Sequence, residues 1–563
     1  MPDFQQNIFA FEFWNEPDSL KYIFMKKNEN QALSVNVKNT LSSVGSESET
    51  SFQVSKPKRI PKRLAVYLPE NLDLDKIIEE NPPNEHWAFL DEECNLRKNV
   101  YFQKEKLKYI LHLISYLPTV KKDYDYEVNH GFVPINKSKL QKSGIKDYRP
   151  HLDYLVACGI ICEDKQYFVG QESGGIKFTF EYDFKKTKRA YITKRPIIKA
   201  IIGNSNINQE EYFEKFHYLY KWWNTEKLYI DSVTAKQYLA ERLEKEKVEF
   251  VQKHGMTEQE LYEERLAMTK RQRKADKVKY PTKRYNSASM IVEKIHNCEY
   301  LMKVDAKAGR FHTLLTQLPK DLKQFITYDG KPLVGIDLKN SQPLLATALL
   351  NGEVFSNNPI LFHTIAECKP YYRLLPNMPA KLVKFIERRQ KNKDVQEYKQ
   401  IVTEGLYYEK FGAILLEQGL IPADEATDIK TIRKFAKTAT FASFFAPNRH
   451  SRVIEAMKHF RKTFPTVCAI FSQIKNIPRH IKEKGKMHNA LAVCLQAFEA
   501  NLFLNIICRR VHEIDPEILI FTIHDSIVTT PEHVNIVKQI VDEEIYRAIG
   551  ICPQFNIEEW KRR

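Results

Sequence analysis

Two aspartates, Asp337 in "VGIDLKN" and Asp525 in "FTIHDS", stand at the ends of short apolar runs in this 563-residue sequence. Brought side by side, their carboxylates could bind divalent metal ions, because Mg²⁺ prefers oxygen ligands and accepts one or two carboxylates completed by substrate phosphates. Two such ions about 3.5–4 Å apart suit in-line phosphoryl displacement. Either aspartate alone would more often be structural, so the predicted chemistry depends on the pair.

The elements that must position these aspartates can be read from the flanking residues. Residues 518–523 and 526–530 are rich in β-branched types, which predicts a hairpin with Asp525 at its tip. Residues 332–336 predict a buried strand that ends at Asp337. Asn340 or Ser341 could then cap a departing helix, with a proline in its first turn.

A third segment, "TIRKFAKTATFASFFAPN", lies between the two aspartates in sequence. Arg433, Lys437, Phe441 and Phe445 recur every four residues, so they share one face of the predicted helix. A core helix would not place cations on its aromatic stripe, and a surface helix would not carry so many phenylalanines. This face suits a nucleoside triphosphate, with cations for the phosphates and a ring for the base.

These three segments resemble, in order, motifs A, B and C of a known polymerase core. That core is shared by family A DNA polymerases (the DNA polymerase I type) and single-subunit phage-type RNA polymerases. Asp337 matches the motif A aspartate, "RKFAKTATFASFF" matches motif B, and "HDS" matches motif C. Two further collinear segments resemble the family's T-G-R and I-Q-G-x-x-A-D-I segments: "AGRFHTLLTQLP" and "LQAFEANL". The matches fall between about residues 305 and 530.

The resemblance implies a right-hand polymerase of the α+β class and a role for each matching residue. Asp337, Asp525 and the backbone carbonyl of Leu338 would bind two Mg²⁺ ions, with Mn²⁺ as a possible substitute. The implied catalytic residues are Asp337, Asp525 and Lys437. The implied nucleotide-binding residues are Arg433, Lys437, Phe441, Phe445 and Gln342. The implied primer–template contacts are Arg310, Gln496 and His524.

Departures from the family pattern bear on the choice of sugar. Gln342 is as long as the glutamate of the DNA enzymes, and Phe445 lacks the tyrosine hydroxyl that recognises a ribose; both favour dNTPs. Ser526 in motif C points towards the RNA enzymes. We therefore expect a DNA polymerase that extends a primer. The alternatives are an RNA polymerase or primase, and a DNA-binding replication initiator with an inactive polymerase-like domain.

The charge balance also favours a nucleic-acid partner. The chain has 87 Lys+Arg against 71 Asp+Glu, a formal net charge of +16, and such an excess suggests a polyanionic partner. A basic cluster at residues 271–284 is interleaved with tyrosines and could grip a phosphate backbone. An ordinary solvated face is the alternative. The residues of this cluster expected at the primer–template are Arg271, Arg273 and Lys274.

The predicted organisation has six parts. The N-terminal region, residues 1–99, contains a polar stretch at 28–60 that predicts a mobile linker or surface loop. Three helices and a hairpin at 100–182 have the order of a winged helix, which serves either DNA binding or protein contact. The polymerase parts would be a helical thumb at 200–295, a palm at 296–345 and 490–563, and fingers at 346–489.

Cysteine usage and hydropathy indicate an intracellular protein. The nine cysteines include no CxxC pair, so Cys158 and Cys162 are interpreted as reduced thiols rather than zinc ligands. No run approaches the roughly 20 apolar residues of a membrane span, and the start of the sequence lacks a signal-peptide pattern. We therefore expect cytoplasmic localisation without a membrane partner. The oligomeric state is left open.

Overall fold

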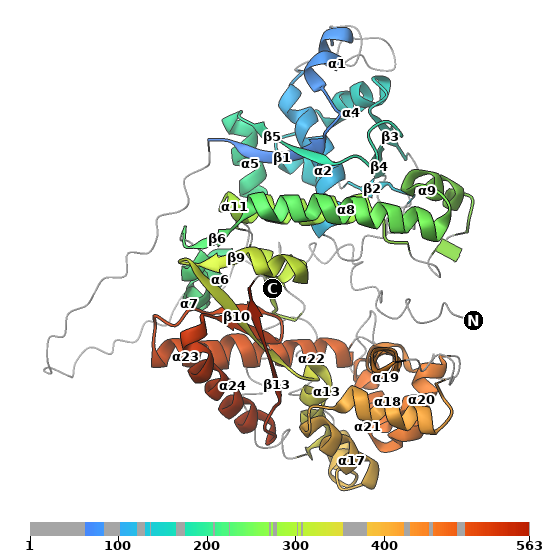
Figure 1. Ribbon diagram of the computed structural model, residues 1–563, viewed down its shortest axis with the longest axis vertical. Helices are drawn as coiled ribbons and strands as arrows, with labels where there is room; N and C mark the ends of the chain where they lie inside the picture. The colour runs from blue at the N-terminus through green and yellow to red at the C-terminus, as the bar shows by residue number, and fades with distance from the viewer. Residues whose placement is uncertain are drawn as a thin grey trace, which may run out of the picture. The chain divides into compact units, whose positions relative to one another are not determined.

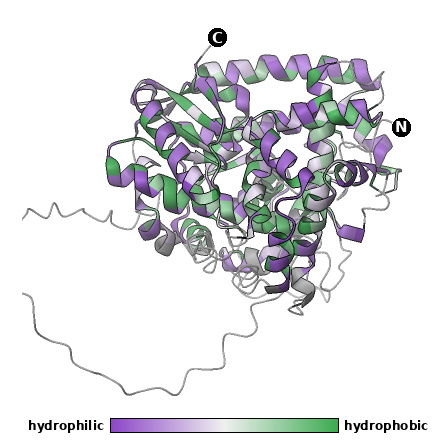
Figure 2. Ribbon diagram, turned by 90° about the horizontal axis from the view of Figure 1, so that it is seen from below, coloured by the Kyte–Doolittle hydropathy of each residue, from purple (hydrophilic) through white to green (hydrophobic). Residues whose placement is uncertain are grey.

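The computed structural model divides into two compact units, residues 12–207 and residues 1–11 with 208–563 (Figure 1). Both combine helices with antiparallel sheets, and most helices alternate hydrophilic and hydrophobic residues around their circumference (Figure 2). The structure describes residues 62–83, 102–120, 130–135, 137–164, 175–205, 209–223, 226–269, 272–273, 278–300, 302–305, 308–352, 380–421, 428–449, 454–480 and 490–561.

A six-stranded sheet organises the larger unit. Its strand order is β11-β12-β10-β9-β6, and β13 also pairs with β10; every pairing is antiparallel. The central strand β10 buries four consecutive residues, because side chains on both of its faces meet hydrophobic cores. The strands are β6 (Leu228–Ile230), β9 (Ile326–Tyr328), β10 (Lys331–Leu338), β11 (Phe521–Ile523), β12 (Ser526–Thr529) and β13 (Phe555–Trp560).

One nearly continuous helix, Ala490–Ile514, forms much of the core beside this sheet. It comprises α22 (Ala490–Ala500), a π-helical turn η9 (Asn501–Ile507) and α23 (Cys508–Ile514). The π-turn frees the carbonyl of Leu504, which accepts a hydrogen bond of 2.8 Å from the Tyr218 hydroxyl. Among the described residues this helix alone is long and apolar enough to cross a membrane, but 83% of its most apolar window is buried inside the protein.

A group of helices packs beside the end of β10, with α18 to α21 coloured orange in Figure 1. Aromatic side chains form its interior, including Tyr407, Phe411 and Phe464, which are fully buried. Its members are α13 (Ser341–Ala346), η4 (Thr347–Leu350), α16 (Ala380–Glu387), α17 (Lys393–Thr403), α18 (Tyr407–Glu417), α19 (Ile429–Phe445), α20 (Glu455–Thr463) and α21 (Pro465–His480). After β12 the chain continues with η10 (Pro531–His533) and α24 (Val534–Ile549).

Two long helices, α8 (Ser232–His254) and α11 (Pro281–His296), pack together in the segment expected to be a helical thumb. The segment is mainly helical, and it also contributes the short strand β6 to the sheet. α9 (Glu258–Leu266) begins with a capping box of Thr257 and Glu260. The remaining elements are α6 (Gln209–Lys215), α7 (His217–Tyr220), η2 (Lys221–Trp223), β7 (Lys303–Val304), β8 (Phe311–His312), α12 (Leu314–Gln317) and η3 (Lys320–Phe325).

The smaller unit has the order helix, strand, helix, helix, hairpin between α2 and β4, with the sheet order β2-β4-β3. It is larger than residues 100–182, because β1 pairs with β5 and an additional helix stands at each end. The predicted linker at 28–60 lies outside the described residues. The elements are β1 (Leu64–Pro69), α1 (Leu74–Glu80), α2 (Lys104–Val120), β2 (Val133–Pro134), α3 (Lys137–Lys142), α4 (Tyr148–Ala157), β3 (Ile161–Glu163), β4 (Gly175–Phe178), β5 (Thr187–Ile192) and α5 (Arg195–Ser205).

Candidate active site

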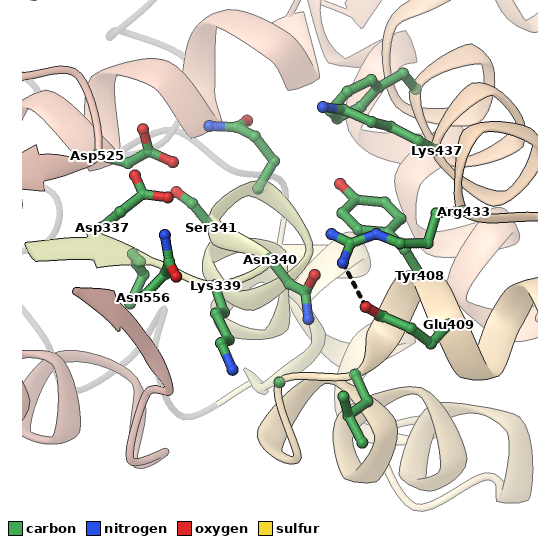
Figure 3. A pocket seen from close by; sticks show the side chains of 15 residues that line it. Asp337, Lys339, Asn340, Ser341, Tyr408, Glu409, Arg433, Lys437, Asp525 and Asn556 are labelled. Atoms are coloured by element: carbon green, nitrogen blue, oxygen red, sulfur yellow. Dashed lines mark hydrogen bonds and ion pairs between the residues drawn. The ribbon is translucent and has the colours of Figure 1, made fainter. Parts of the chain in front are cut away.

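Strand register brings the two predicted aspartates together. Asp337 pairs with Ser526 in the β10–β12 ladder, so the preceding residue, Asp525, lies beside the end of β10. The backbone N–H of Leu338 faces the carbonyl oxygen of Asp525 at 3.4 Å. The two carboxylates point into the same space (Figure 3). Asn556, opposite Asp337 on β13, lines that space too.

Two residues next to these aspartates have left-handed backbones. His524, at the first position of the β11–β12 turn, has a φ of 56°, and Asn340, at the N-cap of α13, has a φ of 53°. A non-glycine residue in this region costs on the order of 1–3 kcal/mol and persists only where surrounding structure enforces it. The three-strand ladder of β11, β12 and β10 enforces the hairpin geometry, so the position of Asp525 is fixed by the sheet.

Burial and like charge disfavour ionisation of the aspartate pair. Loss of solvent and the charge of Asp525 raise the pKa of Asp337 to about 6, partly offset by Lys323 and Lys320. Burial also raises the pKa of Asp525, and its own backbone N–H and the charges of Arg310 and Lys437 act in the opposite direction. A bound divalent cation would favour the ionised form of both carboxylates and so lower both pKa values.

The donor set fits Mg²⁺. Asp337 and Asp525 offer hard oxygen ligands, and Leu338 lines the same cavity. Within the described ranges, no cluster of three or more His, Cys, Asp or Glu side chains is placed to hold a metal ion. Two carboxylates would therefore need water and substrate phosphates to complete the coordination, which is how Mg²⁺ is usually bound in phosphoryl-transfer sites.

The carboxylates form one wall of a cavity of about 450 Å³, and α19 forms another. This volume is within the range of small-molecule sites, about 300–1,000 Å³. Arg433 and Lys437 of α19 lie across the cavity from the aspartates (Figure 3). Nη1 of Arg433 is 2.5 Å from Oε1 of Glu409 on α18. α19 begins at an N-cap, where the Asp428 side chain accepts from the backbone of Thr431.

The aromatic part of the α19 face continues from these cations. Nζ of Lys437 lies 5.6 Å from the ring centre of Phe441, and the Phe441 and Phe445 rings stack at 5.3 Å. Tyr408 meets the edge of Phe441 at 6.4 Å. Phe441 and Tyr408 line the cavity, but Phe445 is outside the set of described residues that line it. Phe445 stacks on Phe441 and packs against the core, and its contact with a nucleotide stays a prediction.

Glu499 is the residue of this site that the sequence analysis missed. Its Oε1 accepts a hydrogen bond of 2.6 Å from Nη2 of Arg310, and its Oε2 accepts one of 2.6 Å from Nε2 of Gln342. Burial raises the pKa of Glu499 to about 7; Arg310 lowers it and Asp525 raises it further. The available signal was its position as the one charged residue in the apolar stretch 490–507, because a buried charge requires a partner.

The other residues expected at the primer–template lie around the hairpin and on α22. The ring of His524 is 5.9 Å from that of His312, whose Nε2 is 3.4 Å from a carboxylate oxygen of Asp305. Gln496 is partly exposed, and it is the one residue of α22 that is not buried. Arg310 is held by Glu499, so its guanidinium is directed into the protein.

The expectation for the basic cluster needs a correction at Arg273. Its side chain is 2% exposed, and its Nη1 donates to the carbonyls of Arg265, Leu266 and Met268 at the end of α9. The carbonyl of Arg265 also accepts from the backbone N–H of Met268. The guanidinium thus adds a donor at a helix end, where carbonyls lack their usual i+4 partners, and it is directed away from any phosphate. Arg271 and Lys274 lie outside the described residues.

Comparison with known proteins finds a likeness among solved structures only. No protein-family model matches the sequence, and no curated protein matches it. Among solved structures, the chain is similar to the POL domain of Pol1 from M. smegmatis in complex with DNA primer-template and dNTP. The TM-score is 0.30 at 10% sequence identity, over 65% of this chain and 76% of that chain. The function is accordingly inferred from the site itself.

Proposed function

We propose that this protein is a nucleotidyltransferase, and that it extends a primer on a template with dNTPs as a DNA polymerase. The observation that carries the proposal is a cavity lined by carboxylates on one side and by cations on the other. Asp337 and Asp525 lie on one side, and Arg433 and Lys437 lie on the other. Carboxylates alone would favour a metal ion, and cations alone would favour an anion. Their combination suits a triphosphate bound together with its metal ions.

Asp337, Asp525 and the carbonyl of Leu338 would hold Mg²⁺, or Mn²⁺ in its place. The ions, when bound, would acidify the primer 3′-hydroxyl and stabilise charge on the pyrophosphate. The protein's own contribution is to keep the two carboxylates at fixed positions on paired strands.

The residues of α19 would act on the triphosphate. Arg433 and Lys437 neutralise the phosphate charge, and the Lys437 ammonium can give a proton to the departing pyrophosphate. Such preorganised cations need no rearrangement as charge develops, and this is why they stabilise a transition state efficiently. Phe441 would lie beside the sugar and base, with Phe445 stacked on it. Gln342, on the α13 wall, would crowd a ribose 2′-hydroxyl and so favour dNTPs.

The proposal assigns the larger unit to the parts of a right hand. The sheet, from residues 296–345 and 490–563 with β6 added, would be the palm. The helices within 346–489 would be the fingers, and α8 with α11 would occupy the thumb position. Arg310, Gln496 and His524 would then contact or support the primer–template.

Primer extension by the purified full chain tests the proposal. A labelled primer on DNA or RNA template is incubated with four dNTPs or four NTPs, with Mg²⁺, Mn²⁺ or EDTA. We expect metal-dependent extension with dNTPs, absent in the Asp337→Asn and Asp525→Asn variants. A wild-type protein that prefers NTPs would support the RNA polymerase or primase alternative, which Ser526 in motif C favours. Absence of any incorporation would refute the proposal.

The alternative of a replication initiator takes residues 100–182 as its DNA reader, and one arginine of that segment is already paired within the protein. Arg149 of α4 bonds through Nη1 and Nη2 to both carboxylate oxygens of Glu163, at 2.8 and 2.6 Å, and through Nε to Asp153 at 2.9 Å. A guanidinium engaged by two carboxylates is poorly available to phosphates or bases.

A further inference from the structure

Glu499 joins two segments that are distant in sequence. Arg310 follows the turn between β7 and β8, and Gln342 lies in the first turn of α13. Each binds a different oxygen of the Glu499 carboxylate, at 2.6 Å in both cases. The carboxylate thus fixes the distance between a cation of the palm and a wall of the nucleotide cavity.

Because Glu499 is buried, loss of its hydrogen bonds to Arg310 and Gln342 would be costly. Glu499 is 1% exposed within α22, which is otherwise apolar around it. A buried carboxylate without a partner costs several kcal/mol, so Arg310 and Gln342 cannot leave it without loss. Loss of either partner would leave a buried acceptor unsatisfied.

The carboxylate also dictates which way the Gln342 amide faces. In the structure Gln342 turns its NH₂ group towards Glu499, because its Nε2 donates to Oε2 of that carboxyl group. Its Oε1 is then directed away from Glu499, and this buried oxygen has no hydrogen-bond partner among the described residues. Gln342 therefore stands in the cavity wall in one enforced orientation.

We propose that Glu499 is a positioning residue that sets sugar selectivity by holding Gln342 against the nucleotide cavity. The inference rests on the proposed function, in which Gln342 meets the sugar. Without the tether, a long and flexible glutamine side chain rotates freely and ceases to exclude a 2′-hydroxyl. Arg310 is the partner that holds the Glu499 carboxyl group in place.

The test is the ratio of kcat/KM for a dNTP to that for the matching NTP. Glu499→Gln keeps the shape but replaces an acceptor oxygen with an NH₂ group, so the two amides compete for orientation. We expect this ratio to fall by about tenfold, equivalent to about 1.4 kcal/mol. A purely structural role would reduce both substrates' kcat/KM equally and leave the ratio unchanged.

Three further variants sharpen the result. Gln342→Met keeps the length without the amide, and should lower the ratio even if Glu499→Gln fails to fold. In Gln342→Gly, adding Glu499→Gln should change the ratio no further, because the tethered group is absent. Glu544→Gln is the matched control. Glu544 is a buried carboxylate of α24 that pairs with Arg510 of α23 and Arg547 of α24, and it lies outside the cavity lining. The dNTP/NTP ratio should therefore not change in this variant.

The outcomes separate the two proposals. A wild type that incorporates neither dNTPs nor NTPs overturns the proposed function and this inference with it. A wild type that discriminates, and whose ratio is unchanged in both Glu499→Gln and Gln342→Met, overturns this inference alone. A lowered ratio in Gln342→Met that Glu544→Gln does not reproduce supports it.

Discussion

Nη1 of Arg433 lies 2.5 Å from Oε1 of Glu409, so a cation that faces the candidate metal site is already paired with a carboxylate. A triphosphate must compete with Glu409 for this guanidinium. We expect Glu409→Gln to lower KM for the nucleotide by about 1.5- to 5-fold, because half-exposed ion pairs contribute roughly 0.2–1 kcal/mol. Lys434→Gln, an exposed residue of the same helix outside the cavity lining, is the control. An increase in KM for Glu409→Gln would mean that the carboxylate itself binds substrate.

The aspartate pair should affect stability and activity in opposite directions. Folding raises the pKa of Asp337 from 3.8 to about 6, so the unfolded chain releases this proton first. The metal-free protein therefore loses stability as pH rises from about 4 to 6. In Asp337→Asn the stability should not fall over this pH range, and without metal at pH 7.5 its Tm should be no lower than that of the wild type. It should also lose the Mg²⁺-dependent rise in Tm and reduce synthesis by about a thousandfold or more.

A matched control for that experiment lies at the other end of the same strand. Asp329, in the β9–β10 turn, is exposed and paired with Lys227. Asp329→Asn should keep both synthesis and the Mg²⁺ effect on Tm. Equal Mg²⁺ stabilisation of Asp337→Asn and wild type would remove Asp337 from the metal site.

Sugar choice should depend on the side chain at position 342. We expect Gln342→Gly to raise the use of NTPs relative to dNTPs by about tenfold, because a crowding side chain of the cavity wall is removed. The measurement is single-nucleotide incorporation with each substrate under the same conditions. Unchanged selectivity would show that Gln342 is not the sugar gate.

Arg273 should matter for stability and not for nucleic-acid affinity. Arg273→Gln removes a charged donor from the carbonyls at the end of α9, and we expect it to lower the free energy of unfolding by about 1–3 kcal/mol. Below the melting range, the dependence of DNA affinity on salt should be unchanged. Lys279→Gln alters an exposed residue of the same cluster, and should reduce the log–log salt slope by about 0.9 if it contacts phosphate. A reduced salt slope in Arg273→Gln with an unchanged slope in Lys279→Gln would identify Arg273 as a phosphate contact.

Lys475 should make stability rise with pH. Its ammonium is buried and donates to the carbonyls of Ser443 and Ala446 at the end of α19. Burial lowers its pKa from 10.5 to about 7. The folded state therefore releases this proton before the unfolded chain does, and stability rises between about pH 7 and 10.

Lys475→Met should abolish that rise, and it should cost about 1–3 kcal/mol because two buried carbonyls lose their donor. Chemical denaturation at pH 7 and pH 9.5 measures both effects. Lys434→Met, on the exposed face of α19, is the control. An identical pH dependence in wild type and Lys475→Met would contradict the prediction.

The parts of the site that could be predicted are those set by local pattern. Four-residue spacing placed Arg433, Lys437 and Phe441 on one face of α19, and apolar runs ending in acids placed Asp337 near a strand end and Asp525 in a hairpin turn. In both cases the signal is a periodicity or a strand end, which the neighbouring residues determine.

The parts that could not be predicted depend on distant partners. β6 is three residues long with only Tyr229 pointing outward, too short for alternation to identify it, and its pairing with β9 makes it a strand. In sequence Arg273 resembles the other basic residues of 271–284, since nothing local says that a helix end lies within reach. Glu499 was readable as a buried charge, but its partners Arg310 and Gln342 lie 189 and 157 residues away.

The position of β10 between β12 and β13 has a consequence for biosynthesis. The strand that carries Asp337 ends at residue 338, but its partner β13 ends at residue 560. At about 5–20 residues per second, the ribosome needs on the order of 10–45 s to make the intervening chain. During that interval the nascent protein has its first aspartate but no ladder to hold it, and the apolar strand β10 stays open to wrong partners. Chaperone engagement of the nascent chain should therefore peak after β10 emerges and end when β13 does.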